Sequence, residues 1–216
     1  MALTRLGGAN AITGVIPVAN GGIGIASGTT DQFLKFTGTT TLASSADNAG
    51  LNFISNTALS SAGSLDISSV FSSTYANYRI IGSGLNMAND NNAWVFQLRT
   101  DSAVTNTSYW WAGVGQRDTG SAVDDGETDT TDWRIIGNCA NTGQALNFDM
   151  TVYRPNLGLY TSYTCIAGGR RSGGGGQVLN CGGYQNTTTQ FTGFRILVDS
   201  GNISAGNITV FGISDS

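Results

Sequence analysis

Alternation of apolar and polar residues is the sequence feature that most constrains the fold of this chain. The clearest example runs from Ala145 to Tyr153, where every second residue is apolar: Leu146, Phe148, Met150 and Val152. A period of two places these side chains on one face of a β-strand and the intervening side chains on the other. The segment from Phe194 to Asp199 alternates in the same way. No segment shows a sustained helical period, so we expect an all-β protein.

About nine segments of the last two thirds of the chain have strand character, and clusters of Gly, Asn and Asp separate them. Tight turns between strands favour these residue types. Many short strands at such spacing predict a jelly-roll-like β-sandwich. The predicted strands are 78–85, 94–100, 109–116, 132–139, 145–153, 161–167, 177–184, 194–199 and 207–213.

Charge is scarce in this chain. Charged residues make up 11% of the sequence, against roughly 25% in ordinary soluble domains. The net charge is −4, with Lys35 as the single lysine and no basic run. The electrostatic footprint of nucleic-acid binding is therefore missing, and we expect no nucleic-acid partner. No apolar run reaches the roughly 18 residues of a transmembrane segment, so we also expect no membrane insertion.

The first 30 residues differ in character from the rest. From Leu6 to Thr30 there is no charged side chain, and seven glycines and Pro17 interrupt every apolar run. Such a segment cannot build a core, because glycine adds little buried surface and loses much backbone entropy on ordering. We therefore predict an extended arm over residues 1–30 that lies on another surface. A Ser/Thr/Gly-rich connector with short strands follows over 31–75, and the β-sandwich head occupies 76–216.

The residue inventory argues against an enzyme. The chain has no histidine, which excludes Ser-His-Asp and Cys-His sites, and a Ser-Lys site would rest on Lys35 alone. A paired-carboxylate glycosidase stays conceivable, but the dense acidic cluster lies within one polar stretch, residues 124–132. We interpret that stretch as a solvated hairpin loop, with a calcium site as the alternative. We expect no catalytic residue, cofactor or metal.

The three cysteines, Cys139, Cys165 and Cys181, lack metal-ligand spacing and are interpreted as buried free thiols. A single disulfide with one thiol left over is the alternative. The sequence from Met1 to Arg5 has no continuous apolar stretch that would indicate a signal peptide.

Two groups of residues are candidates for contact with a ligand or a partner. Tyr109, Trp110 and Trp111 are adjacent, and on a strand the two tryptophans face opposite sides. An exposed aromatic ring stacks on sugars or anchors an interface, whereas a buried one fills the core. Trp94 and Trp133 are predicted core residues. Arg170 and Arg171 lie in a Gly-rich stretch that we interpret as a long hairpin tip. The alternative is a contact loop whose arginines meet an acidic neighbour or an anionic glycan.

Several phrases of the sequence carry a resemblance. Residues 9–14 (ANAITG) and 16–24 (IPVANGGIG) look like the N-terminal segments of tail-fibre and other structural proteins of tailed bacteriophages. In those proteins an "ipvaNGGTG" phrase recurs, often followed by a "G…FL…nGtt" phrase that residues 31–40 fit; Ile23 departs from the usual threonine. Residues 73–81 and 206–212 resemble the opening and closing segments of β-sandwich modules in phage fibre and virion-surface proteins.

The resemblance implies a non-enzymatic virion structural protein, made in the host cytoplasm, that forms a homotrimer and docks on other virion proteins. Our leading hypothesis is a tail-fibre or spike-type protein whose sandwich contacts host surface glycan. The alternative is a capsid decoration (cement) protein whose arm lies across the shell of major capsid protein. The short chain favours the decoration protein, and the arm phrases favour the fibre. The docking residues of the arm would be Ile12, Val15, Ile16, Pro17, Val18, Ile23 and Ile25.

Overall fold

The computed structural model describes residues 33–36, 42–45, 50–143 and 146–214. The chain divides into two units, Met1–Ala49 and Gly50–Ser216. In the first unit, β1 (Phe33–Phe36) and β2 (Leu42–Ser45) form an antiparallel hairpin on which Leu34 and Phe36 are exposed. The arm predicted over residues 1–30, with its seven docking residues, lies outside the described residues.

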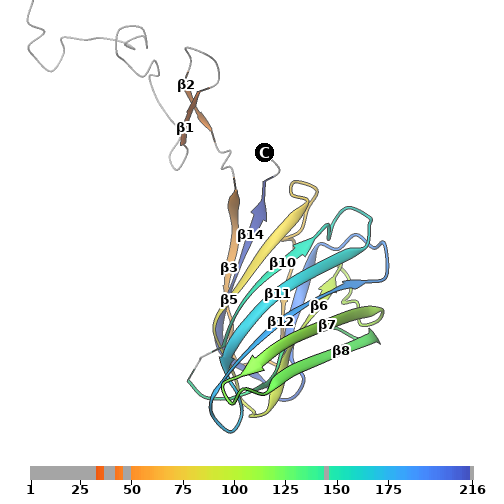
Figure 1. The fold of residues 1–216 in the computed structure, drawn as a ribbon. Helices are drawn as coiled ribbons and strands as arrows, with labels where there is room; N and C mark the ends of the chain where they lie inside the picture. The colour runs from red at the N-terminus through yellow and green to blue at the C-terminus, as the bar shows by residue number, and fades with distance from the viewer. Residues whose placement is uncertain (1–32, 37–41, 46–49, 144–145, 215–216) are drawn as a thin grey trace, which may run out of the picture. The chain divides into compact units, whose positions relative to one another are not determined.

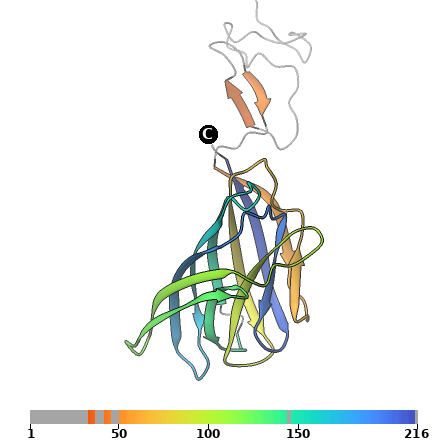
Figure 2. The ribbon, with the colours of Figure 1, turned by 90° about the vertical axis from the view of Figure 1, so that its right-hand side faces the viewer.

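The second unit is a sandwich of two antiparallel sheets, which confirms the predicted all-β class (Figures 1 and 2). The larger sheet has eight strands, in the order β3 (Leu51–Ala58), β14 (Ile203–Ile213), β5 (Asn77–Met87), β10 (Leu146–Tyr153), β11 (Thr161–Arg170), β12 (Gly176–Gln185), β7 (Tyr109–Arg117) and β8 (Ala122–Thr130). The smaller sheet has four strands, in the order β4 (Ser64–Ile67), β13 (Gly193–Val198), β6 (Asn92–Arg99) and β9 (Trp133–Cys139). Figure 1 looks onto the larger sheet, and Figure 2 shows the molecule from the side that carries β7 and β8.

All nine predicted strands are present, and the sandwich also takes in part of the segment predicted as a connector. Strand β3 pairs with β14, and β4 pairs with β13. The reason is apolar burial: Ile67 is buried, and Ile54 and Leu65 pack against the core. The compact unit therefore begins at Gly50.

The acidic stretch was predicted wrongly as a loop. Residues Ala122–Thr130 form β8, which pairs along β7 and is the edge strand of the larger sheet. Its carboxylates are exposed, while Val123 packs against the core. Charges along an edge strand hinder pairing with the edge of another molecule. A solvated edge strand shows no clear alternation of hydrophobicity, which is why the sequence pattern did not indicate it.

Stacked aromatic rings join the two sheets. Trp133 on β9 stacks on Tyr163 of β11, with ring centroids 4.4 Å apart, and on Phe96 of β6 at 6.0 Å. Phe96 in turn stacks on Phe194 of β13 at 4.7 Å. Trp94 and Trp133 have no exposed surface, which confirms that both belong to the core. Such ring pairs add stability beyond the area that they bury.

We expect Phe194→Ala to lower the free energy of unfolding by about 3–5 kcal/mol, because it leaves a cavity in this stack. Urea unfolding followed by tryptophan fluorescence measures the change. The matched control is Phe53→Ala on β3, where the ring is 65% exposed and the loss should stay below about 1 kcal/mol. Equal losses for the two variants would contradict the assignment of the stack as the core.

An ion-pair group lies on the smaller sheet. The Arg195 guanidinium donates to both carboxylate oxygens of Asp66, at 2.6 and 3.0 Å, and Arg99 lies 4.0 Å from the same carboxylate. The hydrogen bonds from Arg195 hold the pKa of Asp66 below its ordinary value. About a third of each of the Asp66 and Arg195 side chains is exposed, so solvent weakens the pair.

Asp66→Asn should therefore cost about 0.5–1 kcal/mol of stability at pH 7. An aspartate whose pKa is lowered by folding stabilises the protein above its unfolded pKa, and that contribution is lost as pH falls through the folded value. The difference between variant and parent should thus disappear in acid. Thermal unfolding between pH 2 and 7 measures it, with Asp129→Asn on β8 as the control. A difference that persists unchanged at pH 2 would contradict an electrostatic origin.

Candidate functional site

The three adjacent aromatic residues separate as the period of two requires. Tyr109 and Trp111 point into the core, and Trp110 lies on the opposite, outer face of the larger sheet. The Tyr109 hydroxyl donates to the Thr105 carbonyl at 3.0 Å and accepts from the Leu98 amide at 2.7 Å. Of the three, only Trp110 is placed to meet a ligand on the outer face.

Trp110 forms an aromatic pair with Tyr184 on β12. The two residues face each other across β7 and β12, and their rings stack with centroids 5.7 Å apart and 27° between planes. Tyr184 remains 37% exposed. The indole N–H of Trp110 is buried and finds no acceptor among the described residues.

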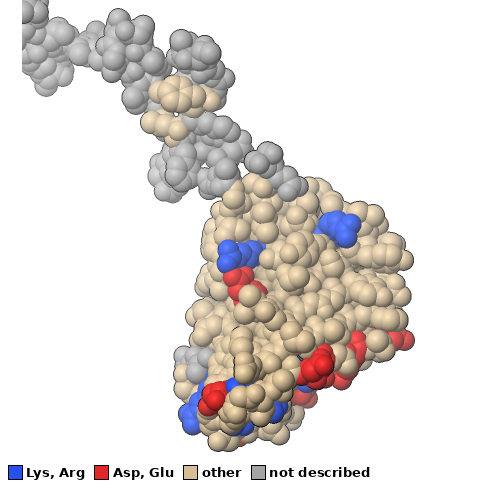
Figure 3. Space-filling view, in the orientation of Figure 1, with Lys and Arg blue, Asp and Glu red and all other residues tan. Residues whose placement is uncertain are grey.

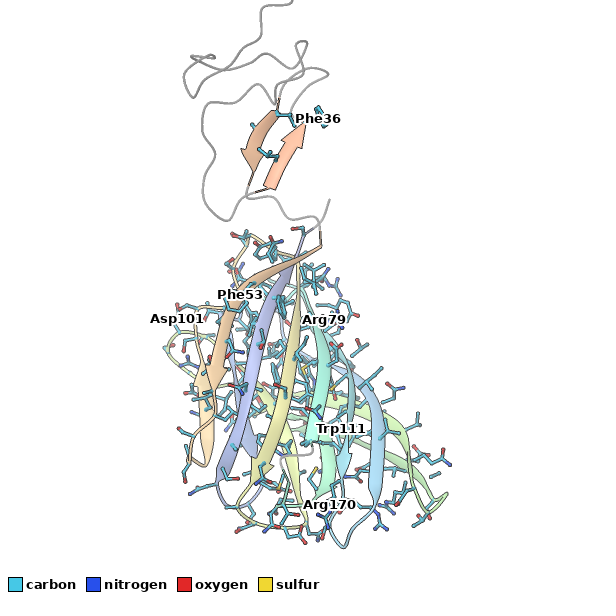
Figure 4. The ribbon with its side chains drawn as sticks, turned by 90° about the vertical axis from the view of Figure 1, so that its left-hand side faces the viewer. Phe36, Phe53, Arg79, Asp101, Trp111 and Arg170 are labelled. Atoms are coloured by element: carbon cyan, nitrogen blue, oxygen red, sulfur yellow. The ribbon has the colours of Figure 1, made fainter. Side chains whose placement is uncertain are left out.

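Arg170 and Arg171 lie on the hairpin between β11 and β12, which confirms the predicted hairpin tip. Arg170 donates to the Thr142 hydroxyl at 3.1 Å, and the Arg171 guanidinium lies 3.7 Å from the Asp118 carboxylate. Arg171 thus pairs within its own chain, and the expected contact of these arginines with a ligand or a partner stays a prediction. In Figure 4, Arg170 lies at the hairpin end of the sheet, away from Arg79.

The strand registers define a central row on the outer face of the larger sheet, with one residue from each strand. From β8 to β3 the central row is Gly126, Ala112, Gly182, Thr164, Thr151, Arg79, Phe211 and Phe53. Its first three members are small, so this end of the row is a shallow trough. Alanine in place of Gly182 would bring a Cβ atom to 3.0 Å from the Tyr163 carbonyl oxygen, which the packing accommodates poorly.

A cavity of about 770 Å³ lies over five members of the central row, those from Ala112 on β7 to Arg79 on β5, and we call it the groove. A second cross-strand row lies beside the central row and lines the groove with it: Asp124, Val114, Asn180, Ile166 and Asp149. Val114 is 62% exposed and Ile166 is 56% exposed. The Trp110–Tyr184 pair lies two residues along each strand from Ala112 and Gly182, a distance of about 7 Å. It is the next pair that faces outward.

Few charges reach the groove (Figure 3). The Arg79 guanidinium binds both carboxylate oxygens of Asp149, through its Nε at 2.9 Å and through its Nη2. This contact raises the pKa of Arg79. Asp124 adds an exposed carboxylate at the β8 end. The remaining lining consists of hydroxyl, amide, aliphatic and backbone groups and of the residues Cys165 and Cys181.

The arrangement provides hydrogen-bonding groups and apolar surface, which are the components of a binding site for a polar, uncharged ligand. Among the described residues, no group of three Cys, Asp or Glu side chains is placed to hold a metal ion. None of the described residues forms a helix that is long and apolar enough to cross a membrane. The pattern of the sequence alone did not predict the central row. The glycines at 126 and 182, inside predicted strand and acidic segments, were the one signal that pointed to it.

The three cysteines are buried free thiols, as predicted. Cys165 and Cys181 lie opposite each other on β11 and β12 and point inward, behind the floor of the groove. The Cys181 thiol donates to the Arg134 carbonyl oxygen at 3.3 Å. Burial raises the pKa of Cys139 to about 12. Burial, which the three thiols share, keeps reagents in solution away from them in the folded protein.

We therefore expect none of the three thiols to react with iodoacetamide at pH 8 in the folded protein, and all three to react in urea. Mass spectrometry counts the added groups. A Thr119→Cys variant, in an exposed turn, supplies a reactive thiol as the positive control. Rapid labelling of any native cysteine in the folded parent would contradict this expectation.

Comparisons with known proteins give no further guidance on the groove. No protein-family model matches the chain, and no curated protein and no solved structure is detectably similar to it.

Proposed function

We propose that this chain is a non-enzymatic structural protein of a tailed-bacteriophage virion, most simply a trimeric tail-fibre or spike-type protein. In this proposal the N-terminal arm docks on other virion proteins and the sandwich contacts host surface glycan. The observation that carries the proposal is the outer face of the larger sheet, an open face with a groove whose lining holds one arginine and two aspartates. The sequence phrases of residues 9–40 point to the same class of protein.

The groove supports a binding role rather than a catalytic one. Two carboxylates line it, those of Asp124 and Asp149. A glycosidase needs one carboxyl that donates a proton and another that attacks or activates water. Asp149 is held on both oxygens by Arg79, and Asp124 stands exposed on an edge strand. Neither position favours a carboxyl tuned for proton transfer.

Exposed apolar side chains support association into an oligomer. Leu34 and Phe36 are exposed on the β1–β2 hairpin, and Leu51 and Phe53 are exposed on β3. A two-stranded hairpin alone is marginally stable in water, so β1 and β2 gain from contact with neighbouring copies. Closed cyclic symmetry supplies such contacts for every copy equally.

The copy number per virion tests the placement. We expect a few dozen chains or fewer, counted by quantitative mass spectrometry of purified virions against the major capsid protein. We also expect the purified protein to sediment as a trimer and to bind host cells. Several hundred copies per virion would overturn the fibre assignment in favour of the decoration protein.

A functional comparison separates the same two roles. The purified trimer is added to host cells and to capsids stripped of it. A trimer that ignores host cells but restores the heat resistance of the capsids would contradict the fibre proposal. A monomer in sedimentation would contradict the trimer.

A further inference from the structure

We infer that the groove binds neutral saccharides and rejects acidic ones. This inference rests on the contact with glycan proposed above. The Trp110–Tyr184 pair provides the stacking surface, and Thr151, Thr164 and Asn180 provide the hydrogen bonds. The following contacts carry this inference.

Stacking is available beside the trough. The Tyr184 ring is exposed on the outer face, and its stack on Trp110 fixes its orientation. The neighbouring row positions on the same two strands are Gly182 and Ala112. These small residues leave room next to the ring, so a sugar can lie over the trough and place its apolar C–H face against the aromatic surface. Val114 and Ile166 flank the opposite side with exposed aliphatic groups.

Neutral hydrogen-bonding groups line the rest of the path. Thr164 and Thr151 are opposite each other on β11 and β10, and Asn180 is opposite Ile166. The Thr164 hydroxyl already lies 3.2 Å from the Tyr153 hydroxyl, which orients it. Hydroxyl and amide groups both donate and accept hydrogen bonds, as sugar hydroxyls do. Recognition of this kind needs no charged group.

The charges select against an acidic sugar. The single cation of the groove lining, Arg79, is bound on two nitrogens by Asp149. Asp124 lies at the β8 end. A carboxylate or sulfate on the ligand would meet the carboxylates of Asp124 and Asp149, and the one arginine of the groove lining is already paired. Arg170 and Arg171, the residues expected to meet an anionic glycan, lie outside the groove lining and are engaged by Thr142 and Asp118.

Binding of the full-length protein to defined oligosaccharides tests the inference. The neutral probes are linear glucan, mannan and galactan oligosaccharides, and the acidic probes are oligogalacturonate, oligoalginate and sialylated oligosaccharides, all titrated by calorimetry. We expect binding within the neutral set and at least about tenfold weaker binding within the acidic set. Binding should change little between 50 and 500 mM NaCl, because screening acts on charged contacts. Preference for the acidic probes, or no binding to any neutral probe, would overturn the inference.

Variants locate the binding in the groove. Tyr184→Ala should weaken binding at least tenfold, and Ala112→Trp should abolish it by filling the trough. The matched control is Tyr160→Ala, which removes another exposed tyrosine, 53% exposed, and leaves the Trp110–Tyr184 pair in place. If Ala112→Trp fails to fold, Tyr184→Ala and Thr164→Val decide the question. Unchanged binding in both of these folded variants would overturn the assignment to the groove.

The test of saccharide binding and the test of the proposed function can fail independently of each other. Copy number and location on the virion test the fibre assignment without any sugar. A protein found in several hundred copies that still binds neutral probes through Tyr184 would overturn only the fibre assignment. A protein of low copy number that binds none of the neutral probes would overturn only the present inference.

Discussion

The stack of Trp133 against Tyr163 and Phe96 is the contact on which the sandwich depends. It joins the middle of the larger sheet to the smaller one, and all three rings are fully or almost fully buried. Tyr163 adds a hydrogen bond from its hydroxyl to the Arg134 carbonyl oxygen on β9, at 3.0 Å. These contacts of Tyr163 fix β11 against the smaller sheet. The outward residues of β11, Thr164 and Ile166, therefore have fixed positions in the groove.

Within the larger sheet, the spacing of β7 and β12 restricts which residue can stand at position 183. At Gly183 on β12, a Cβ atom would lie 2.0 Å from the Trp110 carbonyl oxygen, so β7 and β12 approach too closely there for any side chain. The neighbouring pair on the outer face, Trp110 and Tyr184, are direct cross-strand partners and stack there.

Alternation predicted the nine strands because each of them buries one face, and burial leaves a pattern of period two. It did not predict β8, where Val123 is the one side chain of the strand that packs against the core and the rest face solvent. The period of two also placed Trp110 and Trp111 on opposite faces, but it does not say which face is the core. The groove depends on register: Ala112, Gly182 and Thr164 adjoin through pairings between three strands that no local pattern encodes. The proposed preference for neutral glycan rests on the partners of Arg79 and Arg171, which are also set by the tertiary fold.

Arg134 connects the inner packing to the charge of the groove. Arg134 lies on β9, the edge strand of the smaller sheet. Its guanidinium carbon lies 5.2 Å from the centroid of the Trp111 ring on β7 of the larger sheet. The guanidinium also lies 3.8 Å from the carboxylate of Asp125. Alternation on β8 turns Asp125 toward this inner face and Asp124 toward the groove. One of two adjacent carboxylates therefore has a cationic neighbour and the other does not, and the uncompensated one lies where an acidic ligand would have to bind. The proposed preference of the groove for neutral ligands therefore rests on Asp124 and not on Asp125.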